Sequence, residues 1–292
     1  MPMEYFEQRE RALLGDRFDV LYAAPQETAE RGVTVSALRS SPEQFAAKAD
    51  FPLEASPFCK AAFVVHQPDD LKFRPGRHPY HHAGVFYSQE PSASSAAPLL
   101  GVQPGMRVLD MCAAPGGKSF ALAIDMGDRG DILSCDIHPH KLALIEKGAA
   151  RLGIRSVRTA LADGREHHAA WENAADLVVA DVPCSGLGII RKKPDIRYKD
   201  PKELAELPAI QAAILDNAAT YVRPGGVLLY STCTVLPEEN EGVTTAFLDT
   251  HPEFALEPFT LPRPIGGCCG QLTLWPQRYG TDGFYICRMR RK

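Results

Sequence analysis

Short apolar runs alternate with amphipathic segments along the chain from about residue 106 onward. Five runs have the length and the nearly continuous apolar character of buried strands: residues 107–111, 132–137, 157–162, 177–181 and 227–232. Four segments between or after them space their apolar residues as helices do: residues 118–126, 138–152, 201–221 and 237–250. Because strands that alternate with helices form βαβ units, this order predicts a doubly wound α/β fold around a parallel sheet.

The helix predicted over residues 201–221 carries signals at both of its ends. Asp200 suits the N-cap, and Pro201 suits the first helical position, where its missing N–H leaves no hydrogen bond unmade. Apolar residues recur on one face from Leu207 to Ala218. The pair Gly225-Gly226 is expected to stop the helix, since glycine favours the backbone conformation found just beyond helix ends.

Residues 1–76 have a different pattern, which predicts a small α+β domain. A charged helical segment runs from Tyr5 to Leu14, an alternating segment runs from Val33 to Leu38, and Ser41-Pro42 is typical of a helix start. The larger domain is then expected to cover residues 77–292.

Composition and charge exclude several classes of protein. Hydrophobic residues make up 45% of the 292 residues, which is enough to build cores and excludes a disordered chain. No apolar run approaches the roughly 20 residues that span a bilayer, and the charged residues from Met1 to Arg11 do not form a signal-peptide core. We therefore expect a cytoplasmic protein without membrane contact. The eight cysteines lack zinc-site spacing, so neither a metal site nor a disulfide framework is expected.

The predicted strand ends carry residues that suit an adenosine-containing ligand. In a doubly wound sheet, ligands bind beyond the carboxyl ends of the strands. There the chain places a turn of small residues and three acids: Cys112, Ala113, Ala114, Pro115, Gly116, Gly117 and Lys118, then Asp136, Asp163 and Asp181. The two glycines allow the backbone to approach a ligand closely. Asp136 follows them by about the 20 residues expected of an acid that binds ribose hydroxyls.

The kind of ligand is narrowed by the motifs that this turn lacks. Both the G-x-G-x-x-G fingerprint and the phosphate-binding G-x-x-x-x-G-K-[ST] spacing are absent, which favours a ligand without phosphates. S-adenosylmethionine fits, with Asp136 and Asp163 for ribose and adenine and the turn amides for the aminoacyl end. A nicotinamide cofactor and an ordinary strand-to-helix turn are the alternatives.

Two cysteines follow predicted strands, Cys184 after Asp181 and Cys233 after Thr232. If those strands are neighbours, about 4.8 Å apart, both thiols reach one edge of the sheet. The alternative is core packing, because free cysteine is often buried.

A pair of thiols at a cofactor site suits the methylation of cytosine at ring carbon five. A thiolate that adds to ring carbon six makes carbon five able to attack a sulfonium methyl group. The attacking thiol needs a base, a positive charge or a helix N-terminus to ionise, and the helix expected near Pro237 offers one for Cys233. The residues alone do not say which thiol attacks. Asp181 is a candidate to bind the ring edge or, when protonated, to neutralise charge that develops at ring nitrogen three. The alternative is that Asp181 serves only as a carboxylate of the cofactor site.

Taken together, these motifs resemble the Nop/Sun family of RNA cytosine-5 methyltransferases. The matching segments are Leu109 to Lys118, Asp181 to Gly186, Tyr230 to Thr234, Pro237 to Asn240, Trp275-Pro276 and Asp282 to Phe284. The resemblance covers about residues 77–292 and implies a class I methyltransferase (Rossmann-like) domain with S-adenosylmethionine as cofactor. It implies that Cys233 is the nucleophile and that Cys184 assists release of the methylated RNA. It also implies cofactor contacts from Cys112 to Lys118 and from Asp136, Asp163 and Asp181.

The first domain is similar to the N-terminal module of the RsmF-like enzymes, which are the bacterial members of this family that act on small-subunit ribosomal RNA. The similarity lies in Leu13-Leu14-Gly15 and in Gly32 to Arg39. It implies ribosomal RNA as the partner, with tRNA or another RNA as the alternative, and we expect a monomer. The family usually has Arg-x-Asn where this chain has Thr34-x-Ser36, so that contact is not carried over.

Local basic segments are the candidates for RNA contact, since the net charge of the chain is −4. Residues 184–202 hold six basic residues against two acidic ones, and the candidate phosphate ligands are Arg191, Lys192, Lys193 and Arg197. A solvated loop is the alternative. The segment from Phe73 to Tyr87 mixes Arg, His and aromatic residues, which suits single-stranded RNA or, equally, a hinge between the domains.

Three classes of function follow. The leading one is an RNA methyltransferase. A small-molecule methyltransferase or nucleotide oxidoreductase would not need Cys184 and Cys233 together. The third is an RNA-binding assembly factor with an inert fold.

Overall fold

The structure is a computed structural model that describes residues 2–16, 18–19, 31–66, 74–262 and 265–292. Within these residues, a large sheet has the spatial order β10-β14-β9-β8-β5-β6-β7, with β13 beside β14. The strands are β5 (Arg107–Asp110), β6 (Asp131–Asp136), β7 (Val157–Leu161), β8 (Ala175–Asp181), β9 (Val222–Thr232), β10 (Phe254–Leu256), β13 (Gln271–Leu274) and β14 (Phe284–Arg291).

The pairing of these strands confirms the doubly wound fold. β7, β6, β5, β8 and β9 are parallel neighbours, whereas β14 runs antiparallel to β9. The chain proceeds outward from β5 through β6 to β7 and then returns to β8 on the other side of β5. The order therefore reverses between β5 and β8, which is the point where doubly wound sheets bind ligands.

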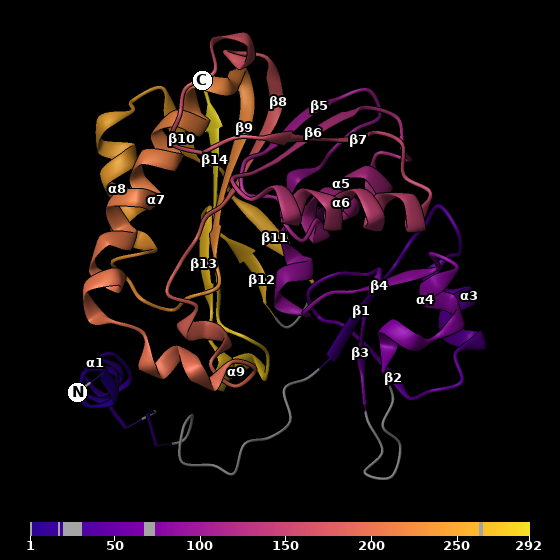
Figure 1. Ribbon diagram of the computed structural model, residues 1–292, viewed down its shortest axis with the longest axis horizontal. Coiled ribbons are helices and arrows are strands. Elements are labelled where there is room, and N and C mark those ends of the chain that lie inside the picture. Colours follow the sequence, from indigo (N-terminus) through magenta and orange to yellow (C-terminus); the bar gives the residue numbers. More distant parts are fainter. Residues whose placement is uncertain (1, 17, 20–30, 67–73, 263–264) are drawn as a thin grey trace.

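Helices cover both faces of this sheet (Figure 1). α5 (Gly117–Asp125) and α6 (Pro139–Leu152) lie on one side, and α7 (Pro201–Tyr221) and α8 (Glu241–Thr250) lie on the other. Successive strand residues point to opposite faces, so Val179 packs with the α5 and α6 core while Val178 packs with the α7 core. The central strands are thus apolar on both sides, as their sequences indicate.

Both ends of α7 lie where the sequence predicts them, but the cause of its end differs from the prediction. The Asp200 side chain accepts a hydrogen bond from the Lys202 N–H, as an N-cap does. The helix ends at Tyr221, and Val222 already pairs with Ala175 of β8. The expected stop at Gly225-Gly226 is wrong, because those glycines lie in an irregular excursion of β9 where the register with β8 shifts. Pairing with β8 ends the helix before its glycine signal is reached.

α8 begins at Glu241 and not near Pro237. The difference has a physical reason, since the side chain of Asn240 is occupied by hydrogen bonds to Thr232 and Thr234 at the end of β9. Residues 237–240 are held there as a turn instead of a first helical turn.

A second, antiparallel sheet with the order β2-β3-β1-β4 forms the N-terminal unit. Its strands are β1 (Arg31–Val35), β2 (Leu53–Ala55), β3 (Ala62–Val65) and β4 (Phe86–Ser88), with α3 (Pro42–Lys48) beside them. Ser41 caps α3 as expected. The sheet extends past residue 76, where the sequence places the junction, because β4 pairs with β1.

α1 (Pro2–Leu14) lies apart from this small sheet, on the opposite side of the molecule (Figure 1). It packs beside the 3-10 segment η6 (Pro194–Tyr198), and Phe6 is buried with Leu187 and Leu236. α1 thus packs away from the small sheet with which the sequence analysis groups it. The apolar face of α1 is covered by the loops that follow Cys184 and Cys233.

The remaining short elements connect these units. They are α4 (Pro79–His82), α9 (Pro276–Tyr279), the β11 (Phe259–Leu261) and β12 (Gly266–Cys268) hairpin, and η1 (Pro75–Arg77), η2 (Ser92–Ser95), η3 (Pro98–Leu100), η4 (Ala169–Trp171) and η5 (Leu187–Ile189). In the segment from Phe73 to Tyr87, Phe73 lies outside the described residues. The carbonyls of His81 and Phe86 accept hydrogen bonds from Arg151 at the end of α6. This segment therefore connects the N-terminal unit to the unit built around the large sheet.

Across the described ranges, no helix combines the length and the apolar character that crossing a bilayer requires.

Candidate active site

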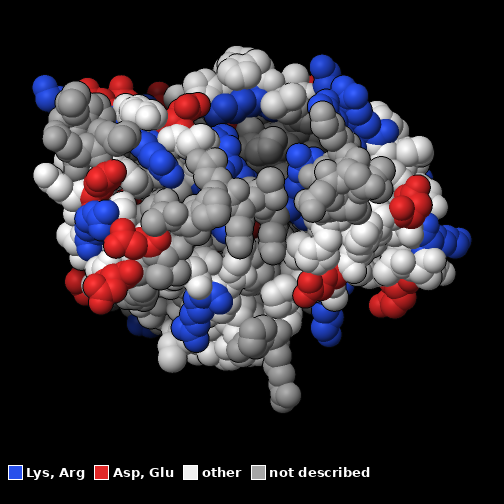
Figure 2. Space-filling view, turned by 90° about the horizontal axis from the view of Figure 1, so that it is seen from below, with Lys and Arg blue, Asp and Glu red and all other residues white. Residues whose placement is uncertain are grey.

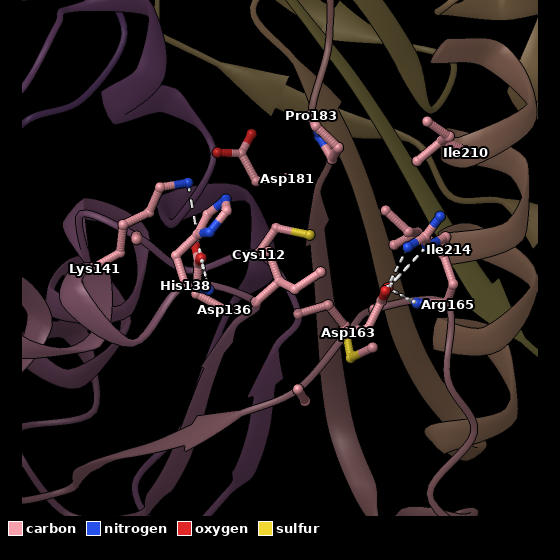
Figure 3. A pocket seen from close by; sticks show the side chains of 15 residues that line it. Cys112, Asp136, His138, Lys141, Asp163, Arg165, Asp181, Pro183, Ile210 and Ile214 are labelled. Carbon is pink, nitrogen blue, oxygen red and sulfur yellow. Dashed lines mark hydrogen bonds and ion pairs between the residues drawn. The ribbon is translucent and has the colours of Figure 1, made fainter. Parts of the chain in front are cut away.

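A cavity of about 350 Å³ opens at the carboxyl ends of the parallel strands (Figure 3). It lies where the strand order reverses, between β5 and β8. Its lining includes Met111, Cys112 and Ala114 after β5, Asp136, Ile137, His138 and Lys141 from β6 onward, Ala162, Asp163, Gly164 and Arg165 after β7, Asp181 and Pro183 from β8 onward, and Ile210 and Ile214 from α7. The predicted acids of three strands thus meet in one space.

The small-residue turn after β5 forms one wall of this cavity. Gly116 has φ +104°, a conformation that favours glycine, and an added Cβ would lie 2.4 Å from the Phe120 ring. Gly117 begins α5, so the turn and the unpaired N–H groups of the first helical turn face the same region. Of the predicted turn residues, Cys112 and Ala114 line the cavity, while Ala113, Pro115, Gly116, Gly117 and Lys118 complete the turn around it.

Asp136 and Asp163 differ in their partners. Asp136 accepts a hydrogen bond from the His138 N–H at 2.9 Å, and Lys141 Nζ lies 3.7 Å from it. Asp163 is bound by Arg165, whose Nε and Nη2 lie 3.0 and 2.5 Å from its two oxygens. These hydrogen bonds from Arg165 hold the pKa of Asp163 below its usual value. Asp163 is therefore favoured in the ionised, hydrogen-bond-accepting form.

Asp110 lies below the turn and was not predicted as a site residue. Its carboxylate is fully buried, and Oδ2 accepts a hydrogen bond from Ser119 Oγ at 2.6 Å. Burial raises the pKa of Asp110 to about 7. The signal in the sequence is its place as the last residue of a buried strand, directly before the turn.

The structure brings the two predicted thiols together. Cys184 Sγ and Cys233 Sγ are 3.1 Å apart, and the Cys233 N–H lies 3.3 Å from Cys184 Sγ. Both side chains are half-buried. They meet because β8 and β9 are parallel neighbours whose ends align, with Asp181 opposite Ser231.

Asp181 connects the thiols to the cavity. It lines the cavity, accepts a hydrogen bond from Ser231 Oγ at 2.6 Å, and forms an ion pair with Lys118 Nζ at 2.6 Å. Lys118 also lies 5.0 Å above the ring of Phe284. The sequence places Lys118 in the glycine turn, but only the fold shows that its ammonium reaches the end of β8.

The two thiols differ in their tendency to ionise. The hydrogen bond with Cys184 lowers the pKa of Cys233, and Lys118 acts in the same direction, while burial and Asp181 oppose it. The same hydrogen bond, burial and the charge of Glu239 raise the pKa of Cys184. The site therefore favours a thiolate at Cys233 that accepts a hydrogen bond from the thiol of Cys184.

The basic segment after Cys184 is folded onto the molecule. Arg191 donates hydrogen bonds to the carbonyls of Gly280 and Thr281, and Lys192 forms an ion pair with Asp282 at 2.7 Å. Arg197 is half-buried, 6.0 Å from the ring of Phe6, whereas Lys193 is exposed. Two of the four predicted phosphate ligands thus hold the segment against the loop at residues 280–282.

Lys and Arg side chains border a hollow in the face of the molecule seen in Figure 2. This is the lower face of Figure 1, near α1 and α9. A hollow bordered by positive charge attracts polyanions even on a protein with net negative charge.

Several residues of the site were missed by sequence reasoning. His138, Lys141, Ile210 and Ile214 line the cavity from helix starts or from α7, and no local motif marks them. Glu239 belongs to a segment that sequence comparison singled out, but without a role. Among the described residues, His, Cys, Asp and Glu side chains form no group of three or more that suits a metal ion.

Comparison with known protein families gives two matches that together cover most of the chain. The profile described as 16S rRNA methyltransferase RsmB/F matches residues 97–290. The profile described as the N-terminal domain of 16S rRNA methyltransferase RsmF matches residues 1–91.

Two curated relatives illustrate the similarity. The chain is 42% identical over 212 residues to the "Probable ribosomal RNA small subunit methyltransferase B" of Bacillus subtilis, which covers 70% of this chain and 47% of that protein. It is 34% identical over 288 residues to ribosomal RNA small subunit methyltransferase F of Escherichia fergusonii, covering 94% of this chain and 60% of that one. The chain thus spans about half to three fifths of the length of these relatives.

Solved structures show the same architecture. A methyltransferase homolog protein from Pyrococcus horikoshii superposes with a TM-score of 0.78 at 26% identity, over 98% of this chain and 99% of that one. NSun6 from Pyrococcus horikoshii, solved with SFG, gives a TM-score of 0.80 at 20% identity, over 99% and 97% of the two chains, and supports the fold alone. The predicted class I methyltransferase fold with a small N-terminal sheet is confirmed.

Proposed function

The chain belongs to the RsmB/F family of 16S rRNA methyltransferases, and we propose on that basis that it methylates carbon five of a cytosine in RNA. The observation that carries the proposal is the 3.1 Å approach of Cys184 and Cys233 beside the cavity that Asp181 shares with them. A small-molecule methyltransferase or a nucleotide oxidoreductase would not need such a pair.

The cavity fits S-adenosylmethionine, the cofactor of this family of methyltransferases. Asp136 offers a carboxylate to the ribose hydroxyls, Asp163 lies on the adenine side, and the first turn of α5, which begins at Gly117, offers N–H groups to the aminoacyl end. Ile210 and Ile214 supply apolar wall for a flat ring. When bound there, the cofactor supplies an electrophilic methyl group.

Cys233 serves as the nucleophile in this proposal. Its thiolate forms a bond to ring carbon six of cytosine, and the electron pair displaced from the ring double bond makes carbon five nucleophilic. Once carbon five is methylated, a water molecule acting as base takes up its proton, the ring double bond re-forms, and the bond from carbon six to sulfur breaks with its electron pair returning to Cys233. Cys184 assists this release, as the family resemblance implies.

Asp181 and Lys118 would orient the ring. Asp181 Oδ2 lies 2.6 Å from Lys118 Nζ, and we propose that the Asp181 carboxylate accepts a hydrogen bond from the exocyclic amino group. Lys118 then supplies the positive charge that offsets negative charge developing on the ring.

The substrate is proposed to be small-subunit ribosomal RNA, bound by a monomer in the cytoplasm. Support comes from the N-terminal profile match and from the hollow bordered by Lys and Arg in Figure 2. Arg191, Lys192, Lys193 and Arg197 are the proposed phosphate contacts. Lys193 is exposed, whereas Arg191 and Lys192 already hold the loop at residues 280–282 and would act mainly by shaping the RNA surface.

A methyl-transfer assay tests this function. The purified chain is incubated with labelled S-adenosylmethionine and, in parallel, with unmethylated small-subunit ribosomal RNA, naked tRNA or assembled small subunits. Label in ribosomal RNA, mapped by bisulfite sequencing to cytosine carbon five, is the expected result. RNA binding without any transfer would point to the inert assembly factor, and transfer to tRNA alone would change the substrate.

A further inference from the structure

Two adjacent buried side chains, Glu239 and Asn240, hold the two loops that carry the thiols. Glu239 is 1% exposed and Asn240 is 0% exposed. Glu239 Oε2 accepts hydrogen bonds from the Ser185 N–H at 2.9 Å and from Gln211 Nε2 at 2.8 Å. Glu239 therefore binds the backbone directly after Cys184.

Asn240 does the same for the other loop. Its Oδ1 accepts a hydrogen bond from Thr232 Oγ1 at 2.6 Å, and its Nδ2 donates to the Thr234 carbonyl at 3.1 Å. These two threonines flank Cys233 in the sequence. Neighbouring residues of one turn thus fix the positions of both cysteines, although the cysteines are 49 residues apart.

Further contacts join the loops to each other. Ser185 Oγ and Thr234 Oγ1 are 2.8 Å apart, and the Gly188 N–H donates to the Cys233 carbonyl at 3.1 Å. Gln211 also donates to the Pro183 carbonyl at 3.0 Å. The sulfur-to-sulfur distance is consequently set by the surrounding hydrogen bonds.

The neutral Asn240 and the acidic Glu239 give the two loops different electrostatic surroundings. Glu239 lies on the Cys184 side, where Lys199 Nζ donates to the Ser185 carbonyl at 2.7 Å. Lys118 and Asp181 lie on the Cys233 side as an ion pair. The hydrogen bond between the two thiols is the largest cause that raises the pKa of Cys184 and lowers that of Cys233. The charge of Glu239 further raises the pKa of Cys184, and that of Lys118 further lowers the pKa of Cys233.

We propose that Glu239 is a positioning residue that keeps Cys184 as the protonated, hydrogen-bond-donating member of the pair, so that Cys233 carries the thiolate. The proton lost from Cys233 passes to solvent, and the Cys184 S–H group donates to the Cys233 sulfur. This inference rests on the proposed function, because it explains which cysteine attacks the ring. Geometry and charge in the folded chain, and not the thiols themselves, distinguish the two residues.

Alkylation of the whole chain with iodoacetamide tests the proposal without RNA. The thiolate forms a bond to the carbon of the reagent as iodide leaves, so the rate at each cysteine follows its thiolate fraction. Rates at Cys184 and Cys233 are measured across a pH series by peptide mass spectrometry. In the wild type, Cys233 is expected to react first.

Glu239→Gln is the decisive variant. The amide keeps an acceptor oxygen for Ser185 and Gln211 but removes the charge. The ratio of Cys184 to Cys233 alkylation is expected to rise roughly threefold to tenfold, since a shift of one pKa unit changes the thiolate fraction about tenfold. Glu238→Gln is the matched control, because Glu238 is the adjacent, exposed acid that pairs with Arg9 and should leave the ratio unchanged.

Two results would overturn the proposal: faster alkylation of Cys184 in the wild type, or an unchanged ratio in folded Glu239→Gln. If that variant does not fold, Cys184→Ser and Cys233→Ser each isolate one thiol with Glu239 in place. A higher apparent pKa for the lone Cys184 supports the proposal, and an equal or lower one refutes it. Ordered thiol reactivity without RNA methylation would refute the proposed function alone, whereas methylation with equal thiol reactivity would refute this inference alone.

Discussion

Cys184 and Cys233 are chemically identical side chains that the fold makes unequal. Cys233→Ala is expected to lower methyl transfer to RNA by roughly a thousandfold or more, because burial and the charge of Glu239 raise the pKa of the remaining thiol, Cys184, and disfavour its thiolate. Cys184→Ala keeps the nucleophile but lacks the residue that assists release, so a covalent complex with RNA should accumulate. Denaturing gel electrophoresis detects the complex as a slowly migrating band.

The matched comparison is the double variant Cys184→Ala with Cys233→Ala, which should give no band. A persistent covalent band in Cys233→Ala would reverse the assignment of the two roles. A band in neither single variant, with methylation intact, would show that the chemistry does not pass through sulfur.

Asp136 provides a residue-scale test of the cavity. Asp136→Ala is expected to weaken binding of S-adenosylmethionine roughly tenfold to a hundredfold, since a hydrogen bond to a charged group contributes about 1.5–3 kcal/mol. Isothermal titration calorimetry measures the change. Asp131→Ala is the control, because Asp131 lies at the opposite end of β6 and pairs with the exposed Arg158. Equal affinities in the two variants would remove Asp136 from the ligand site.

Single residues at strand ends could be predicted from the sequence, but their partners could not. Asp136, Asp181, Cys184 and Cys233 follow apolar runs, and parallel strands bring such positions to one edge. The contacts of Lys118 with Asp181 and of Glu239 with Ser185 join residues 63 and 54 positions apart. Periodicity and local motifs carry no information about such pairs, so the role of Glu239 required the fold.

At the scale of elements, α1 illustrates how a tertiary contact overrides local grouping. Its helical character is evident from its sequence. Its apolar face, however, does not pack on the small sheet but is buried against η6 and the loops after the two cysteines. α7 ends at Tyr221, as predicted, but the pairing of Val222 with β8 ends it before Gly225-Gly226 is reached. Local signals therefore predict which element forms more reliably than what it contacts.

The contact of α1 predicts that the N-terminal helix stabilises the active-site loops. Phe6→Ala removes a buried ring that packs against Leu187 and Leu236 and is expected to destabilise this contact by about 3 kcal/mol. Hydrogen exchange should then accelerate in residues 187–198, with smaller changes in the sheet. Glu7→Ala, on the exposed side of α1, is the control. Unchanged exchange in residues 187–198 would mean that these loops are ordered without α1.

At the scale of the whole molecule, two cores on opposite faces of one sheet surround a small set of buried polar groups. The fold class follows from the strand and helix pattern, because an alternating order with apolar strands has few compatible architectures. The relation of the N-terminal unit to the large sheet does not follow from it. That relation depends on Arg151 binding the carbonyls of His81 and Phe86, and neither segment has a signal for the other.

Asp110 links this buried polar set to the stability of the whole fold. Burial raises its pKa from 3.8 to about 7, so the folded state holds a proton that the unfolded state has already released between those values. The contribution of Asp110 to stability is complete below about pH 4, declines as the pH rises and is lost above about pH 7. The loss amounts to about 4 kcal/mol. Asp110→Asn keeps the shape and an acceptor for Ser119 but does not titrate. Its free energy of unfolding, from urea titrations between pH 5 and pH 8, should therefore fall less with pH than that of the wild type.

The control is Asp249→Asn, an exposed change on α8, whose free energy of unfolding should follow the pH profile of the wild type. Parallel pH profiles for wild type and Asp110→Asn would mean that Asp110 is ionised in the folded protein throughout this range.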